Sequence, residues 1–80
     1  MKTFYVRALE SSEYLIKGKI YECLDYVEYS NEYKVKDDYL NKYPGVHVRH
    51  QSFWYTGDCI VRLNPLETQL YLAKERIKNG

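Results

Sequence analysis

Two cysteines and two histidines are the residues of this 80-residue chain best suited to metal binding or nucleophilic chemistry. Structural zinc sites usually take cysteines two to four positions apart, whereas Cys23 and Cys59 are separated by 36 positions. His47 and His50 fall in a segment typical of a strand, where residues three apart point to opposite faces. Both cysteines lie among apolar residues, a setting that does not lower a thiol pKa. The sequence therefore predicts two free, buried thiols, no metal site and no catalytic cysteine; the alternative is a single disulfide between Cys23 and Cys59.

Asp37 with Asp38 and Glu10 with Glu13 are candidate carboxylate pairs. Paired carboxylates can share general acid and base roles, but a predicted strand end and a polar loop are typical places for solvated surface charge. The four glycines are scattered and do not form a phosphate-binding loop. We expect neither an enzyme nor a bound cofactor.

Tyrosine is the residue type furthest from ordinary usage, with ten among 80 residues. A tyrosine ring is apolar but carries a hydroxyl, so it suits half-buried strand positions and a thin β core. The alternative is an exposed platform of rings that contacts a protein or nucleic-acid partner. For a protein partner, the sequence favours four rings and two flanking acids: Tyr39, Tyr43, Trp54, Tyr55, Asp37 and Asp38.

Charge is unevenly distributed although the net charge is only +1. Residues 1–38 carry eight acidic and six basic side chains, whereas residues 39–80 carry three and six. Cations interleaved with rings suit a single-stranded nucleic acid. The alternative function is therefore a nucleic-acid-binding barrel that uses Lys42, Arg49, Arg62, Lys74, Arg76 and Lys78.

Alternating apolar and polar residues predict five short strands, over residues 3–9, 20–29, 32–39, 46–50 and 59–63. Ser30-Asn31 predicts a hairpin turn, and Gly18 is expected to supply a backbone angle that other residues resist. In the second strand, Tyr21, Cys23, Val27 and Tyr29 are expected to share one face that Asp25 interrupts. Both faces are mixed, so this strand is expected either to bend or to serve two packing layers. Residues 41–45 are expected to be a loop, and residues 53–55 an apolar anchor.

The end of the chain predicts an amphipathic helix over residues 65–78. Asn64 is a favourable N-cap residue, Pro65 suits the first helical position, and Glu67 completes a pattern like a capping box. Leu66, Leu70, Ala73 and Ile77 repeat at spacings of four, three and four, which places them on one helical face. This helix is expected either to cap an open barrel end or to carry a partner contact.

The chain resembles the Src-homology-3-like small barrels found in short phage-encoded proteins, over residues 15–53. The resemblance lies in Gly18-Lys19-Ile20-Tyr21-Glu22-Cys23, then Tyr33-Lys34-Val35-Lys36-Asp37-Asp38, then Pro44-Gly45 through Phe53. Residues 39–43 and the C-terminal helix depart from the minimal barrel. The resemblance implies a non-enzymatic interaction module, a phage protein that binds and modulates a host or phage protein as an inhibitor or host-takeover factor.

These observations together predict one small domain over residues 1–80, with a barrel over 3–63 and a helix over 65–78. The expected fold is mainly β, a five-stranded and partly open barrel with one C-terminal helix. The alternative is an α+β curved antiparallel sheet with the helix packed on one face. The paucity of cysteines and the lack of a signal-like or membrane-spanning segment predict a cytoplasmic protein. A core this thin also makes a homodimer plausible.

Overall fold

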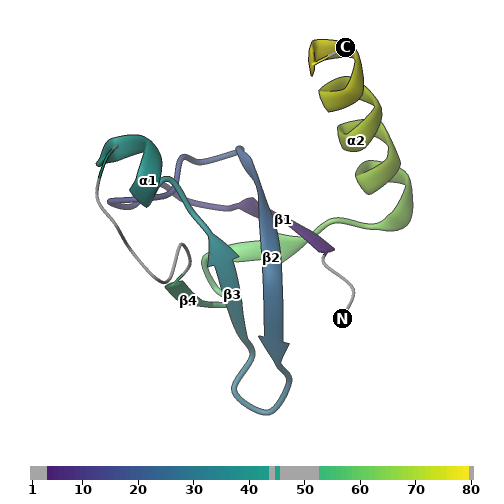
Figure 1. Cartoon of the computed structure of the whole chain (residues 1–80). Coiled ribbons are helices and arrows are strands. Elements are labelled where there is room, and N and C mark those ends of the chain that lie inside the picture. The colour runs from purple at the N-terminus through teal and green to yellow at the C-terminus, as the bar shows by residue number, and fades with distance from the viewer. Residues whose placement is uncertain (1–3, 44, 46–52, 80) are drawn as a thin grey trace.

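The computed structural model describes residues 4–43, 45 and 53–79. Five antiparallel strands form one sheet in the order β4-β3-β2-β1-β5, and the sheet curls into a half-barrel (Figure 1). The strands are β1 (Phe4–Ala8), β2 (Ile20–Val27), β3 (Glu32–Lys36), β4 (Phe53–Thr56) and β5 (Ile60–Arg62). The predicted fold, a mainly β and partly open barrel with one C-terminal helix, is confirmed.

The predicted alternation of inward and outward residues is confirmed in β1 and β3. Val6 and Ala8 are buried in β1, and Val35 is buried in β3. Residues opposite one another in the sheet share a face, so Val35 places its partner Phe53 on the inner face. On the outer face, Glu22 lies opposite Lys36 in a cross-strand pair of opposite charge.

A bulge bends β2 at Leu24, because the pairing with β3 shifts between Cys23 and Asp25. The expected bend is confirmed, but the expected set of residues on that face is wrong beyond the bulge. Tyr26, opposite Tyr33, replaces Val27 on the inner face, and Tyr29 is 95% exposed in the following turn.

The turn between β2 and β3 is where the Ser30-Asn31 pair predicts it. Asn31 has a φ of 51°, in the left-handed region that asparagine tolerates better than most residues. Its carbonyl also accepts a hydrogen bond from the Gly57 amide at 2.9 Å. The turn is thereby tied to residues 57–59, the short link that joins the two edge strands β4 and β5.

The sequence analysis is wrong about two segments between β3 and β5. β3 ends at Lys36, and the predicted extension of this strand to Tyr39 is replaced by a one-turn helix, α1 (Tyr39–Lys42). Residues 53–55, expected to be an apolar anchor, belong to the edge strand β4. The strand predicted over residues 46–50 lies outside the described residues.

The C-terminal helix α2 (Pro65–Asn79) is confirmed together with its capping box. The Glu67 amide donates to Asn64 Oδ1 at 2.8 Å, and the Asn64 amide donates to Glu67 Oε1 at 3.2 Å.

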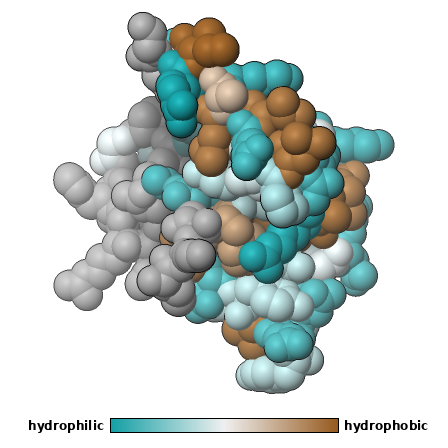
Figure 2. Space-filling view, turned by 90° about the vertical axis from the view of Figure 1, so that its right-hand side faces the viewer, coloured by the Kyte–Doolittle hydropathy of each residue, from teal (hydrophilic) through white to brown (hydrophobic). Residues whose placement is uncertain are grey.

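The helix α2 projects from the barrel (Figure 1). Its leucines remain largely exposed, and Figure 2 shows hydrophobic side chains gathered on this side of the molecule. The alternative fold, with this helix packed across the sheet, is not observed. No helix among the described residues is long and apolar enough to cross a membrane.

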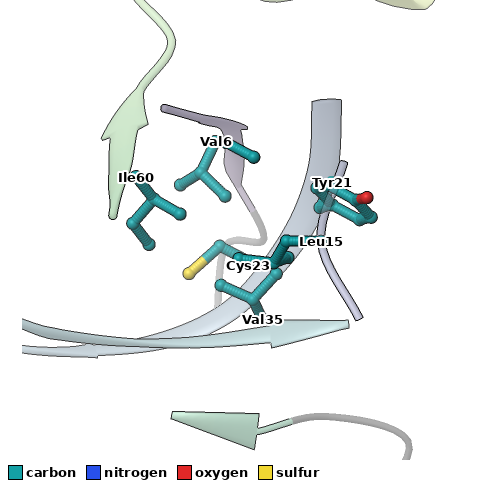
Figure 3. Close-up of a cluster of buried hydrophobic side chains, with 7 residues drawn as sticks. Val6, Leu15, Tyr21, Cys23, Val35 and Ile60 are labelled. Carbon is teal, nitrogen blue, oxygen red and sulfur yellow. The ribbon is translucent and has the colours of Figure 1, made fainter. Parts of the chain in front are cut away.

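The core is a single cluster inside the curl of the sheet (Figure 3). Its side chains come from four strands and from the segment between β1 and β2, which contributes Leu15. They point toward one another, with Cys23 near the centre of the view. The cluster consists of Val6, Ala8, Leu15, Tyr21, Cys23, Val35 and Ile60. A core of this size leaves most aromatic rings at its margins, where they remain available for contacts.

Candidate protein-binding surface

Four aromatic rings pack against one another at the α1 end of the half-barrel. We call Tyr14, Tyr39, Tyr43 and Phe53 the aromatic surface. The ring centres of Tyr14 and Tyr39 are 5.1 Å apart, as are those of Tyr39 and Tyr43. Phe53 stacks on Tyr14 at 5.9 Å and meets Tyr39 at 5.6 Å. Tyr43 and Phe53 nevertheless remain 39% and 41% exposed, so the cluster has an open side.

Tyr14 reaches this surface because its neighbour Leu15 is buried in the core. The segment between β1 and β2 is further fixed by backbone hydrogen bonds. The Gly18 amide donates to the Ala8 carbonyl at 2.8 Å, and the Asp38 amide donates to the Tyr14 carbonyl at 3.0 Å. Gly18 has a φ of 86°, which confirms the expected need for glycine. Tyr14 is therefore held beside α1 by both its neighbour and its own backbone.

Asp37 supports the aromatic surface from within the molecule. Its side chain is buried, and one carboxylate oxygen accepts a hydrogen bond from the Tyr55 hydroxyl at 2.5 Å. The other oxygen accepts from the Tyr39 amide at 3.0 Å, at the start of α1. Burial, followed by the hydrogen bond to Asp37, raises the pKa of the Tyr55 hydroxyl. Asp37 thereby fixes α1 to the inner face of β4.

Asp38 makes a second set of contacts next to the first. It accepts hydrogen bonds from Lys19 Nζ at 2.6 Å, the Tyr21 hydroxyl at 2.6 Å and Asn41 Nδ2 at 2.9 Å. Desolvation opposes ionisation of this carboxyl, but the three donors outweigh it and lower its pKa. The interpretation of Asp37 and Asp38 as solvated surface charge is wrong, because both carboxylates are engaged by the fold.

Lys42 borders the aromatic surface. Lys42 Nζ lies 5.5 Å from the Tyr14 ring centre and 6.0 Å from that of Tyr43. Partial burial, followed by the nearby Glu13 carboxylate, raises the pKa of Tyr14 to about 12. An open groove of about 350 Å³ runs alongside, lined in part by Glu13, Leu15 and Asn41. The surface thus combines uncharged rings with a groove that bears both signs of charge.

The structure separates the residues predicted to contact a protein partner into three groups. Tyr39 and Tyr43 belong to the aromatic surface. Asp37, Asp38 and Tyr55 lie behind it and hold it in place. Trp54 is opposite Lys34 on the outer face of β4, away from the other rings.

Sequence reasoning did not select two residues of the aromatic surface, Tyr14 and Phe53. Alternation within residues 53–56 places Phe53 on the same face as Tyr55, and this pattern was a usable signal. Tyr14 had no comparable signal, because its position beside α1 depends on the route of the chain between β1 and β2.

The basic residues predicted to bind nucleic acid do not gather at one place among the described residues. Lys42 lies beside the aromatic surface, whereas Lys74, Arg76 and Lys78 lie on α2, at the other side of the molecule (Figure 1). The Arg62 guanidinium lies 3.9 Å from the Phe4 ring centre, on β5. Arg49 lies outside the described residues.

Both cysteines are free, as predicted. Cys23 is buried, and this burial raises the pKa of its thiol. Cys59 is only half-buried, so the expectation of two buried thiols holds for Cys23 alone. No cluster of three metal-ligating side chains occurs within residues 4–43, 45 and 53–79. His47 and His50 lie outside this part of the chain.

Comparison with known proteins finds no matching family model, no matching curated protein and no matching solved structure. The geometry of the aromatic surface is therefore the basis for a functional proposal.

Proposed function

We propose that this chain is a small non-enzymatic interaction module that binds a protein partner through the aromatic surface. The observation that carries the proposal is a cluster of rings that is anchored by hydrogen bonds from behind and exposed in front. Aromatic side chains supply most of the anchors in protein interfaces, because they bury a large area with few rotatable bonds.

The support behind the rings favours binding because it reduces the entropy lost when a partner docks. Tyr39 is fixed at its backbone by Asp37, and Tyr14 is fixed by the amide of Asp38. A partner therefore meets rings that are already in place. Tyr43 and Phe53, the two most exposed members, are expected to contribute most of the binding energy.

The resemblance to Src-homology-3-like phage barrels extends the proposal to the kind of partner. We infer a phage-encoded protein that acts in the host cytoplasm, where it modulates a host or phage protein, as an inhibitor does. The aromatic surface and its mixed-charge groove suit a segment of such a protein that carries apolar side chains beside charged ones.

The test is retention of bacterial proteins by the purified chain, followed by isothermal titration calorimetry with the purified partner. The lysate is treated with nuclease, so that a protein is not retained through nucleic acid. We expect Tyr43→Ala combined with Phe53→Ala to weaken binding at least about tenfold. Tyr29→Ala is the matched control, because Tyr29 is 95% exposed and lies in the β2–β3 turn.

Two outcomes contradict the proposal. One is a partner that binds the double variant as tightly as the native chain. The other is recovery of nucleic acid alone, which would favour the alternative of a nucleic-acid-binding barrel. In that case affinity should fall steeply with added salt and with removal of Lys74 and Arg76.

A further inference from the structure

We propose that α2 joins two copies of this chain in an antiparallel helix pair. The contact is formed by Leu66, Leu70, Ala73 and Ile77, which we call the α2 stripe. This inference is independent of the proposed function, because the α2 stripe and the aromatic surface lie on different sides of the molecule (Figure 1).

The α2 stripe is exposed although its composition is that of a buried face. Leu66 is 65% exposed, Leu70 56% and Ile77 80%. The helix contacts its own barrel through a different side, where Glu67 Oε2 accepts from Arg7 at 2.9 Å and Tyr71 packs on Tyr5 at 5.2 Å between ring centres. Figure 2 looks onto this part of the molecule and shows its hydrophobic side chains at the surface. Several large apolar side chains exposed along one helix are typical of a contact site.

The spacing of the α2 stripe favours another helix as its occupant. Intervals of four, three and four residues correspond to the a and d positions of a coiled coil. These positions form a narrow line of knobs that a facing helix accommodates in its holes. A flat surface would leave gaps between them.

The α2 stripe of a second copy packs against this one because the stripe is self-complementary. In an antiparallel pair, a twofold axis passes between Tyr71 and Leu72. Leu70 then faces Ala73 of the partner subunit, and Leu66 faces Ile77 of the partner subunit. The large Leu70 side chain therefore meets a small one at the centre of the contact, and the same patch serves both copies.

Charge on the flanks favours the antiparallel direction. Glu67 and Lys74 border the same side of the stripe, so an antiparallel pair brings Glu67 near Lys74 of the partner subunit. Glu67 already accepts from Arg7, but a carboxylate has lone pairs for a further donor. A parallel pair would instead bring the cations Lys74, Arg76 and Lys78 of both copies together. It would also align the two helix dipoles unfavourably.

Sedimentation velocity over a concentration series up to about 1 mM tests the pairing. A helix of 15 residues spans about 22 Å, so the interface is small and we expect a dissociation constant in the micromolar range or weaker. Leu70→Glu should leave only monomer over the whole series. Leu72→Glu should dimerise as the native chain does, because Leu72 lies on the same helix but off the stripe.

A charge variant tests the same contact without altering its apolar side chains. Lys74→Glu places like charges beside Glu67 in both symmetry-related positions, and we expect it to raise the dissociation constant about three- to tenfold. Circular dichroism checks that all variants retain their secondary structure. If Leu70→Glu is unfolded, the dissociation constants of Lys74→Glu and of the native chain are compared instead, and equal values contradict the pairing.

Cysteine cross-linking tests the direction. In a Cys59→Ser background, Leu66→Cys mixed with Ile77→Cys should form a mixed disulfide faster than either variant does alone. Three results would overturn the proposal: monomer alone at every concentration, an unchanged dimer in Leu70→Glu, or preferential cross-linking of Leu66→Cys to itself. If the native chain is monomeric and Leu70→Glu loses a different protein that the native chain binds, the α2 stripe belongs to that partner instead.

Discussion

Asp37 and Asp38 show how two adjacent carboxylates take on different structural roles. Asp37 is buried and binds groups from β4 and α1. Asp38 binds Lys19, which precedes β2, and Tyr21 within β2, together with Asn41 in α1. A buried acceptor that loses its donor costs more free energy than the hydrogen bond itself contributes. The hydroxyls that contact these carboxylates are therefore expected to matter for stability.

Tyr55→Phe tests this expectation, because it removes one hydroxyl and keeps the ring. The change leaves one Asp37 carboxylate oxygen without its Tyr55 donor, and we expect the free energy of unfolding to fall by about 1–3 kcal/mol. Urea denaturation gives the value. Tyr29→Phe is the control and should change stability by less than about 0.5 kcal/mol, since Tyr29 is at the surface. Equal stability of the two variants would contradict the role given to Asp37.

Asp38 should make stability depend on pH in the acidic range. Its folded-state pKa is lowered, so the unfolded chain binds more protons between the folded and unfolded pKa values. The stabilisation is therefore present above about pH 4, near the ordinary pKa of aspartate, and is lost as pH falls through the folded pKa. We expect the free energy of unfolding of the native chain to decline on acidification more than that of Asp38→Asn, measured by urea denaturation at several pH values. The lowered pKa of Glu67 acts in both proteins and cancels in the comparison. Parallel pH profiles for the two proteins would exclude a contribution from Asp38.

Among the elements, the segment between β1 and β2 decides whether the aromatic surface forms. It has no regular structure, and Leu15 is its only side chain in the core cluster. The neighbouring Ile16 is instead largely exposed. Two adjacent aliphatic residues thus differ in role although the sequence alone does not distinguish them.

Leu15→Ala and Ile16→Ala form a matched pair for this segment. Leu15→Ala leaves a cavity in the core, and we expect it to lower the free energy of unfolding by about 2–5 kcal/mol. Ile16→Ala should cost less than about 1 kcal/mol, because its side chain has little burial to lose. Chemical denaturation measures both. If Leu15→Ala does not fold, Leu15→Val should still cost roughly 1 kcal/mol. Similar losses for the two alanine variants would show that the segment is not anchored as described.

Elements with local signals were predictable from the sequence, and elements fixed by distant contacts were not. The β2–β3 hairpin follows from its turn residues, and α2 follows from the Asn64 cap and its apolar spacing. α1 is a single turn whose start depends on the buried Asp37, so no local pattern announces it. Of the aromatic surface, the sequence predicted only Tyr39 and Tyr43. The position of Tyr14 beside α1 depends on contacts between residues that are distant in the sequence. Likewise, spacing predicted the apolar face of α2 but could not show that the barrel leaves it uncovered.

At the scale of the whole molecule, a thin core spreads tyrosines over both its interior and its margins. Five of the ten have raised pKa values, chiefly because burial disfavours the phenolate: Tyr14, Tyr21, Tyr33, Tyr55 and Tyr71. These five come from β2, β3, β4, α2 and the β1–β2 segment. Ionising them therefore weakens the fold in several places at once.

This distribution predicts that the ionisation of these five tyrosines is delayed in an alkaline titration of the folded chain. A folded pKa above the unfolded value of about 10 gives a stabilisation that is complete below pH 10 and lost as pH rises through the folded pKa. The phenolates of these five tyrosines should accordingly appear above about pH 10, as a late rise in absorbance near 295 nm. Their ionisation should coincide with unfolding, seen as a loss of the far-ultraviolet circular dichroism signal. In concentrated urea all ten tyrosines should titrate in one step near pH 10, which supplies the full amplitude. A single step of full amplitude near pH 10 in a chain that stays folded would mean that the rings are more exposed to water than this half-barrel allows.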